Sequence, residues 1–174
     1  IFFMYGLAFI LLGAVCLMIR PQGTLRIINL GIFGLLHGVN EWLDMLAISI
    51  GDSPDFSRLR LLVMVLSFIF LFEFGRENLF GRKHRWLIIP PLIIIGIGLL
   101  NFPESFSGSG RHLADIGALA RYFLGFTGGL LAGAAFFRHS KISPNITLLV
   151  ASLAMSAYAV ASGLVVAPAS FFPG

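Results

Sequence analysis

The segment that most constrains this chain is residues 25–50, which is long and apolar enough to cross a bilayer. Its second half carries His37, Asn40, Glu41 and Asp44. These positions are separated by three, four and seven residues, so on a helix they lie on one face. Ionisable groups cost several kcal/mol in hydrocarbon and normally face a bundle interior or a wet cavity. The sequence therefore predicts that other helices surround this polar stripe.

The composition is that of an integral membrane protein. Of the 174 residues, 57% are hydrophobic and 11% charged, and the mean hydropathy is +0.93. A soluble domain carries roughly a quarter charged residues, so this chain has too little polar surface to coat a soluble globule. We therefore expect the lipid bilayer as its main partner. The formal charge of +4 is attributed to cytoplasmic loops that face anionic lipid, rather than to nucleic-acid binding.

Segment lengths predict an all-α fold, a polytopic membrane helix bundle that forms a single domain over residues 1–174. At about 20 apolar residues per crossing, six transmembrane helices are expected at about 2–19, 25–50, 59–80, 86–100, 113–137 and 144–166. Pro90 and Pro91 predict a kink or a late start in the fourth. Ser143 and Pro144 are typical of an N-cap and a first helical residue, and predict the start of the sixth.

The distribution of basic residues predicts an orientation. The first, third and fifth loops hold Arg20, Arg26, Arg76, Arg82, Lys83, Arg85, Arg138 and Lys141, whereas the second and fourth hold Arg58, Arg60 and Arg111 beside acidic residues. The positive-inside rule places the odd loops in the cytoplasm and the N-terminus outside. After six crossings the C-terminal end is also outside, so a seventh helix is expected beyond it.

Small residues recur at four-residue spacing on three of the expected helices. They are Gly34 and Gly38 on the second, Gly125, Gly129 and Gly133 on the fifth, and Ser152, Ser156, Ala157 and Ala161 on the sixth. Such spacing lets helix backbones approach closely in a membrane. We expect the second, fifth and sixth helices to form the tight core.

The polar stripe is the candidate ligand-binding pocket. Glu41 and Arg121 each lie about eight residues from the outer end of their helices, or roughly 12 Å deep at 1.5 Å per residue. We predict that they form an ion pair, with Asp44 as the second candidate partner for Arg121. The pair has two interpretations: a structural contact that sets helix register, or a ligand or proton site below the outer surface.

His37 has three interpretations: a hydrogen-bonded core histidine, a proton-responsive group or a metal ligand. A metal would need more ligands, and His112 and Asp115 are weak candidates, so no metal is assigned. Glu73 and Arg76 form a possible inner polar site. One interpretation is that Arg76 neutralises Glu73 locally and reaches the interface; the other is a proton path from Glu73 through His37 to Glu41.

No cofactor is predicted. Bis-histidine haem would need a second deep histidine, but His84 and His139 belong to loops and His112 to an outer mouth. A retinal Schiff base would need a lysine in mid-membrane, and Lys83 and Lys141 are in loops. Cys16 is the only cysteine, which excludes a disulfide framework and a thiolate cluster. Phosphate loops, nucleophile elbows and metalloprotease motifs are also absent, so the sequence predicts no catalytic site.

Several strings resemble a known region of bacterial proteins: HGVNEWLDM, LFEFGRENLF, ARYFLGFTGGLLAG and SGLVVAPASFFPG. They are similar to the N-terminal seven-span sensory region of sensor histidine kinases and diguanylate cyclases. The resemblance implies an inner-membrane input module whose last helix leads into cytoplasmic PAS and kinase or GGDEF domains. It also implies a homodimer and a two-component type of signal transduction, while the output enzyme stays open.

We therefore expect a sensory module of a bacterial signalling protein that detects a small ligand or a membrane state. Two alternatives come from other classes. One is an accessory subunit of a larger membrane complex, with the polar stripe against a partner helix or cofactor. The other is a small proton or solute transporter that uses Glu73, His37 and Glu41.

Overall fold

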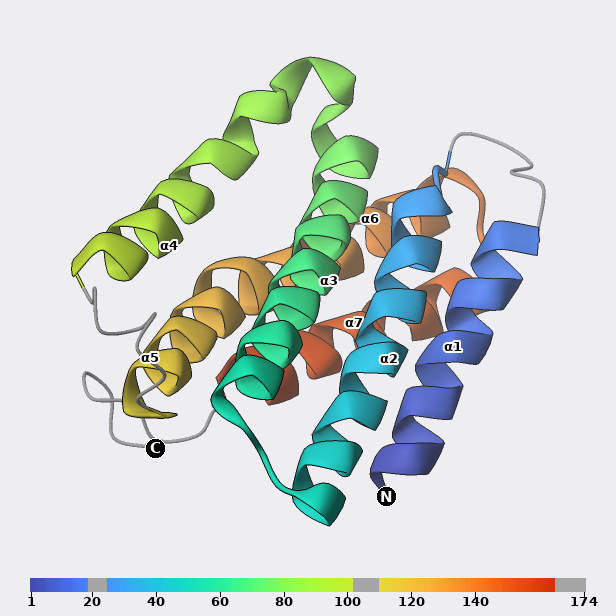
Figure 1. Ribbon diagram of the computed structural model, residues 1–174. Helices are drawn as coiled ribbons and strands as arrows, with labels where there is room; N and C mark the ends of the chain where they lie inside the picture. Colours follow the sequence, from blue (N-terminus) through green and yellow to red (C-terminus); the bar gives the residue numbers. More distant parts are fainter. Residues whose placement is uncertain (19–24, 102–109, 165–174) are drawn as a thin grey trace.

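The computed structural model describes residues 1–18, 25–101 and 110–164, with side chains omitted for 98–101 and 110–112. These residues form helices and no strand (Figure 1). The elements are α1 (Phe2–Met18), α2 (Ile28–Ile50), α3 (Pro54–Phe80), the 3-10 helix η1 (Arg82–Ile88), α4 (Ile89–Asn101), α5 (Gly110–Ala120), the π-helical segment η3 (Arg121–Phe126), α6 (Thr127–Ile142) and α7 (Ile146–Gly163). Because η1 leads into α4, and α5, η3 and α6 run end to end, the six expected helical segments are present.

The helix ends follow local capping chemistry. Ser53 caps α3 by accepting a hydrogen bond from the backbone N–H of Phe56 at 3.3 Å, with Pro54 at the first helical position. Gly51 and Gly81 follow α2 and α3 with φ of 97° and 77°, a left-handed region that favours glycine. Glycine therefore permits both chain reversals.

The expected start of the last helix is wrong by two residues. Ser143 ends α6, and Asn145 is the N-cap of α7, with its Oδ1 accepting from the Thr147 N–H at 2.8 Å. The late start expected from Pro90 and Pro91 is observed, since both lie in the first turn of α4. There their missing N–H groups break no intrahelical hydrogen bond.

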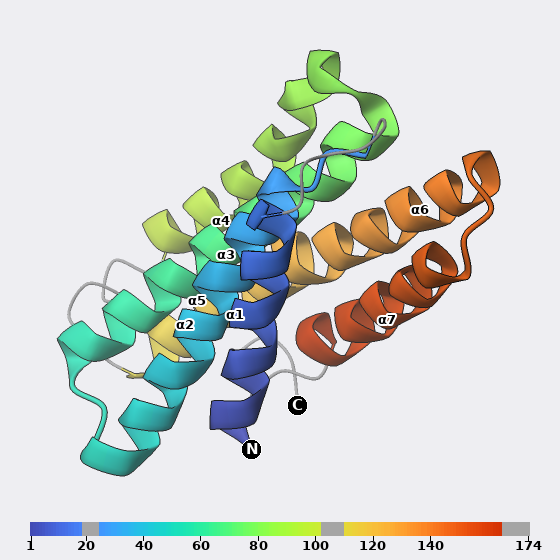
Figure 2. The ribbon, with the colours of Figure 1, turned by 90° about the vertical axis from the view of Figure 1, so that its right-hand side faces the viewer.

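Helix α3 is the central element. Helices α1 and α2 lie side by side as one pair and α6 and α7 as another, and α3 contacts both α2 and α6 (Figures 1 and 2). Helix α4 lies on the outer side of this arrangement and contacts α5. The expected close packing of the fifth and sixth helices is confirmed by the α6–α7 pair, but the second helix is not part of it, because α2 packs on α1 and α3 instead.

Close backbone approach explains these pairings. A Cβ added at Gly34 would lie 2.8 Å from the Gly13 nitrogen on α1, and one at Gly38 would lie 2.6 Å from the Gly6 oxygen. On α6, Gly129 meets Ala159 and Gly133 meets Ser156 of α7. Gly125 instead faces the Phe68 ring of α3. The small-residue spacing thus marked contact faces correctly but did not identify the partner of α2.

Two helices of the described chain are long and apolar enough to cross a membrane, Leu113–Ile142 and Ile146–Gly163. Helix α1 is apolar but shorter. Among the described residues, length and composition therefore identify these two helices as the candidates for crossing a membrane.

Candidate functional site

The polar stripe of α2 faces the bundle interior over half its length. His37 and Asn40 are 3% and 2% exposed, and Glu41 and Asp44 are half-buried. These exposures agree with the prediction that this face of the helix points into the bundle rather than toward lipid. The stripe divides into a deep part around His37 and a shallower part around Asp44.

His37 is held between three helices. Its Nδ1 lies 3.2 Å from the Ser67 Oγ of α3, and its Nε2 lies 2.9 Å from the Tyr158 hydroxyl of α7. The Ser67 hydroxyl donates to the Met64 carbonyl at 2.7 Å. Ser67 must therefore accept from Nδ1–H, which leaves Nε2 of a neutral ring to accept from Tyr158. Both ring nitrogens thus have partners.

The surroundings of His37 are aromatic. The Phe33 ring stacks on the imidazole at a centroid distance of 5.1 Å, and the Phe9 ring meets it edge-on at 4.6 Å. The Glu41 carboxylate lies 3.6 Å from Nε2 and shares that side of the ring with Tyr158. This arrangement is that of a hydrogen-bonded core histidine whose only charged neighbour within ion-pair distance, among the described residues, is Glu41.

The shallower part of the stripe borders a cavity of about 320 Å³ between α2, α3, α5 and η3, which we call the outer pocket. Its polar lining consists of Asn40, Asp44, Asp52, Ser57, Arg60 and Arg121. The guanidinium of Arg60 bridges Asp44 and Asp52, and the Asn40 Nδ2 donates to Asp44 Oδ2 at 3.2 Å. Arg60 therefore makes direct ion pairs with both carboxylates of the pocket, and Arg121 supplies the second positive charge of the lining without touching either.

The predicted ion pair of Arg121 with Glu41 or Asp44 is not formed. Asp44 pairs with Arg60, and Glu41 lies against His37. Arg121 interacts with Glu41 only through longer-range electrostatics, and it forms none of the ion pairs among the described residues. It begins the π-helical turn η3, which displaces it from regular α-helical register. Arg121 does lie near the stripe, as its predicted depth implied. The position of Arg60 on another helix, which the sequence did not show, explains why Asp44 pairs with Arg60 instead.

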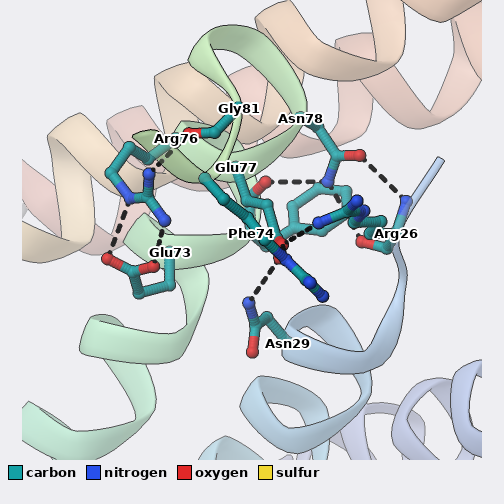
Figure 3. A network of polar contacts seen from close by, with 9 residues as sticks. Arg26, Asn29, Glu73, Phe74, Arg76, Glu77, Asn78 and Gly81 are labelled. Carbon is teal, nitrogen blue, oxygen red and sulfur yellow. Dashed lines mark hydrogen bonds and ion pairs between the residues drawn. The ribbon is translucent and has the colours of Figure 1, made fainter. Parts of the chain in front are cut away.

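The opposite end of the bundle, which the sequence predicts to be the inner one, holds a second polar network (Figure 3). Arg76 is 1% exposed and donates from Nε and NH2 to the two Glu73 oxygens at 3.0 and 2.6 Å. Its NH1 donates to the Gly81 carbonyl at 2.9 Å. The expected local pair with Glu73 is thus present, but Arg76 is buried against the helix end rather than extended to an interface.

Glu77, also on α3, ties the start of α2 to this network. Its carboxylate accepts from Arg26 NH1 at 2.5 Å and from Asn29 Nδ2 at 3.3 Å. Asn78 forms two hydrogen bonds with the backbone of Arg26. Its Oδ1 accepts from the Arg26 N–H at 2.9 Å, and its Nδ2 donates to the Arg26 carbonyl at 3.0 Å. Figure 3 shows both side chains reaching from α3 toward the segment that enters α2.

The weak metal candidates do not form a ligand set. No group of three or more His, Cys, Asp or Glu side chains comes together in the part of the chain that the structure describes. Asp115 is buried on α5 at 1% exposure, and the side chain of His112 lies outside the described residues. His37 is engaged by Ser67 and Tyr158.

Sequence reasoning missed the residues that complete these sites: Asp52, Arg60, Ser67, Tyr158, Arg26, Glu77 and Asn78. The sequence did contain a signal for Tyr158, because a polar aromatic residue stands there within an apolar helix. It also contained one for Glu77 and Asn78, which follow Glu73 by about one helical turn. Their partners come from other helices, so spacing along one segment could not connect them.

Comparison of the chain with protein-family models, curated proteins and solved structures found no match.

Proposed function

We propose that this chain is the membrane-embedded input module of a bacterial signalling protein. A small ligand binds in the outer pocket, and the resulting change in helix packing is relayed to a cytoplasmic kinase or cyclase domain of the same chain, as the resemblance of HGVNEWLDM and ARYFLGFTGGLLAG implies. These residues cross the inner membrane six times with the N-terminus outside, and in the seven-span region that they resemble one further helix reaches the cytoplasm. It works as a homodimer, again by analogy with such signalling proteins.

The membrane location is supported by the surface of the described residues. Many large apolar side chains are exposed along the helices, among them Leu62 on α3, Ile93 on α4 and Leu153 on α7, at 54% or more. The polar groups, by contrast, gather inside the bundle or at helix ends. This inverted arrangement suits a protein surrounded by hydrocarbon, and the basic residues at one end favour a cytoplasmic inner face.

The observation that carries the proposal is the unsatisfied polar chemistry of the outer pocket. Arg121 lines the pocket without an ion-pair partner among the described residues, and the buried Asn40 Oδ1 lacks a hydrogen-bond partner there. An arginine without a direct ion pair and an acceptor without a donor suit a ligand that carries an anionic group and a hydrogen-bond donor. At about 30 Å³ per water-sized group, the pocket accommodates about ten such groups. We infer a small carboxylate with a hydroxyl or amino substituent.

Helix α3 provides the route from this pocket to the inner face. It carries Arg60 at the pocket and Glu73, Arg76 and Glu77 at the inner network. The 17 positions from Arg60 to Glu77 span about 25 Å at 1.5 Å per residue. A ligand that binds one packing of α3 better than another shifts the population toward that packing. The inner end of α3 then transmits the shift to the start of α2 through Arg26.

The test is a thermal-shift screen of the full-length protein, purified in detergent, against small hydroxy and amino carboxylates. We expect at least one compound to raise the unfolding temperature in a concentration-dependent way, because a ligand that binds only the folded state stabilises it. Arg121→Gln should abolish the shift. Arg58→Gln, at the same end of the molecule but outside the pocket lining, should retain it.

A compound that stabilises the wild type and Arg121→Gln equally would contradict the pocket assignment. A compound that binds but leaves kinase or cyclase activity unchanged in native membranes would contradict the relay. Recovery of the protein as a stoichiometric part of an unrelated complex would favour an accessory subunit.

One observation favours a second candidate, a small proton transporter. His37 lies within contact of Glu41, Ser67 and Tyr158, three groups able to exchange protons. Proteoliposomes with an internal pH dye would then show proton flux that Glu41→Gln removes and Arg58→Gln retains. Absence of flux in the wild type would exclude this alternative.

A further inference from the structure

The inner end of the bundle contains two adjoining cavities with a strongly basic lining. The larger, of about 660 Å³, is bordered by Arg26, Arg76, Arg82 and Arg85. The smaller, of about 380 Å³, shares Arg26 and Arg82 and adds Arg138. We call the two together the inner basic pocket. Its lining is more basic than that of the outer pocket.

Two of these arginines are held in place by one acid. The Glu77 carboxylate accepts from Arg26 NH1 at 2.5 Å and from Arg82 Nε at 2.9 Å. Asn78 additionally fixes the Arg26 backbone through two hydrogen bonds. The side chains of Arg26 and Arg82 are still 48% and 67% exposed. Their remaining N–H groups are therefore preorganised and accessible to a further anion.

The pocket has an excess of positive charge. Glu73 is matched by Arg76 in a two-pronged ion pair. Glu77 supplies one negative charge against the two positive charges of Arg26 and Arg82. Arg85, which is exposed and lines the larger cavity, forms none of the ion pairs among the described residues. An anion with several acceptor oxygens would complete this arrangement, and arginine forks suit phosphate oxygens.

The rim of the pocket is apolar. Ile28, 57% exposed, borders the larger cavity, and Ile142, 66% exposed, borders the smaller. Trp86, next to Arg85 in sequence, is 58% exposed, and tryptophan is typical of membrane interfaces. Exposed apolar side chains around a cationic pocket suit an anion that carries acyl chains better than a soluble phosphate.

We propose that the inner basic pocket binds the phosphate headgroup of an acidic phospholipid, with Arg26, Arg82 and Arg85 as the recognising side chains. Basic pockets between helices on the cytoplasmic side are suited to such headgroups. The inference depends on the proposed membrane location and orientation but not on the outer ligand. Bound lipid would bridge the start of α2 and η1, next to the inner end of α3.

The test uses full-length protein in detergent and native mass spectrometry with added phosphatidylglycerol or phosphatidylcholine. Wild-type protein should bind phosphatidylglycerol in preference to phosphatidylcholine. Arg85→Gln should weaken phosphatidylglycerol binding about fivefold, the effect expected of one basic residue near an anionic headgroup. Lys83→Gln removes the same charge two residues away but outside both cavity linings, and should leave binding unchanged.

Equal losses in Arg85→Gln and Lys83→Gln would overturn the site, because general surface charge would then explain binding. So would equal binding of the two lipids by the wild type. In a third arm, inorganic phosphate is added in competition with phosphatidylglycerol. Failure of phosphate to displace the lipid supports a lipid site, and displacement at comparable concentration would show that the pocket serves a soluble anion instead.

Discussion

The buried and half-buried polar groups at the two ends of the bundle differ in how completely they are paired. In the inner network the buried Arg76 uses Nε, NH1 and NH2 as donors, and Asn78 uses both its oxygen and its nitrogen. In the outer pocket Arg121 lacks an ion pair and Asn40 Oδ1 lacks a hydrogen bond, among the described residues. Groups whose donors and acceptors are matched, such as Arg76 and Asn78, fasten helices together. By contrast, Arg121 and Asn40, like the exposed Arg85 at the inner end, remain available to a ligand.

The largest expected effect comes from breaking the inner network at Arg76. Arg76→Leu leaves the Glu73 carboxylate without its partner beside a buried site, and losing one member of a buried pair costs several kcal/mol. We expect a loss of about 3 kcal/mol, toward the lower end of the usual range, because the Glu73 side chain keeps 23% exposure. Chemical unfolding in detergent measures it.

The double variant Glu73→Gln/Arg76→Leu is the control for this prediction. It removes the stranded charge as well as its partner, so it should be more stable than Arg76→Leu alone. A double variant that is as unstable as the single one would show that Arg76 acts through packing rather than through the ion pair.

Glycine-to-alanine substitutions test whether the two ends of the bundle also differ in how tightly their helices pack. A Cβ at Gly75, in the inner half of α3, would lie 2.5 Å from Leu131 Cβ and 2.7 Å from the Ala132 nitrogen on α6. A Cβ at Gly117, on the lining of the outer pocket, would lie 3.7 Å from Leu61, an ordinary contact. Gly75→Ala should therefore cost about 1–3 kcal/mol by overpacking, and Gly117→Ala should be neutral or slightly stabilising. Equal effects on unfolding would contradict the difference in packing.

The two asparagines provide a smaller contrast. Asn78→Ala removes both hydrogen bonds to the Arg26 backbone and should cost about 1–2 kcal/mol in unfolding free energy. Asn40→Leu removes the oxygen that lacks a partner, but also the donation from Nδ2 to Asp44 at 3.2 Å. Its cost should be smaller, about 1 kcal/mol or less, because Asp44 keeps its ion pair with Arg60. A large loss in Asn40→Leu would mean that Asn40 is structural.

The smallest effect on stability is expected at Arg121. Arg121→Gln breaks no ion pair among the described residues, so the unfolding free energy should change by less than about 0.5 kcal/mol. The same variant should lose the response to ligand. A strong destabilisation without ligand would indicate that Arg121 is a structural cation and would remove the main support for the outer site.

Helical periodicity predicted much of this fold and part of the site. Residues 25–50 were expected as one helix with His37, Asn40, Glu41 and Asp44 on one face, and α2 covers residues 28–50 with His37 and Asn40 buried. Capping patterns predicted helix starts less reliably. The serine–proline pattern starts a helix at Ser53 but not at Ser143. Both positions carry the same local signal, and the chain beyond Ser143 instead uses Asn145.

The sequence by itself determined where helices form and which side chains share a face, because both depend on contacts within a few residues of one segment. Tertiary structure alone decided which faces meet. Small residues on α2 suit any close neighbour, and they packed on α1. From the sequence, Asp44 could pair with either Arg60 or Arg121, and it forms its ion pair with Arg60 because α3 packs against α2. Arg121 was thereby left in the outer pocket, where we propose that a ligand completes it.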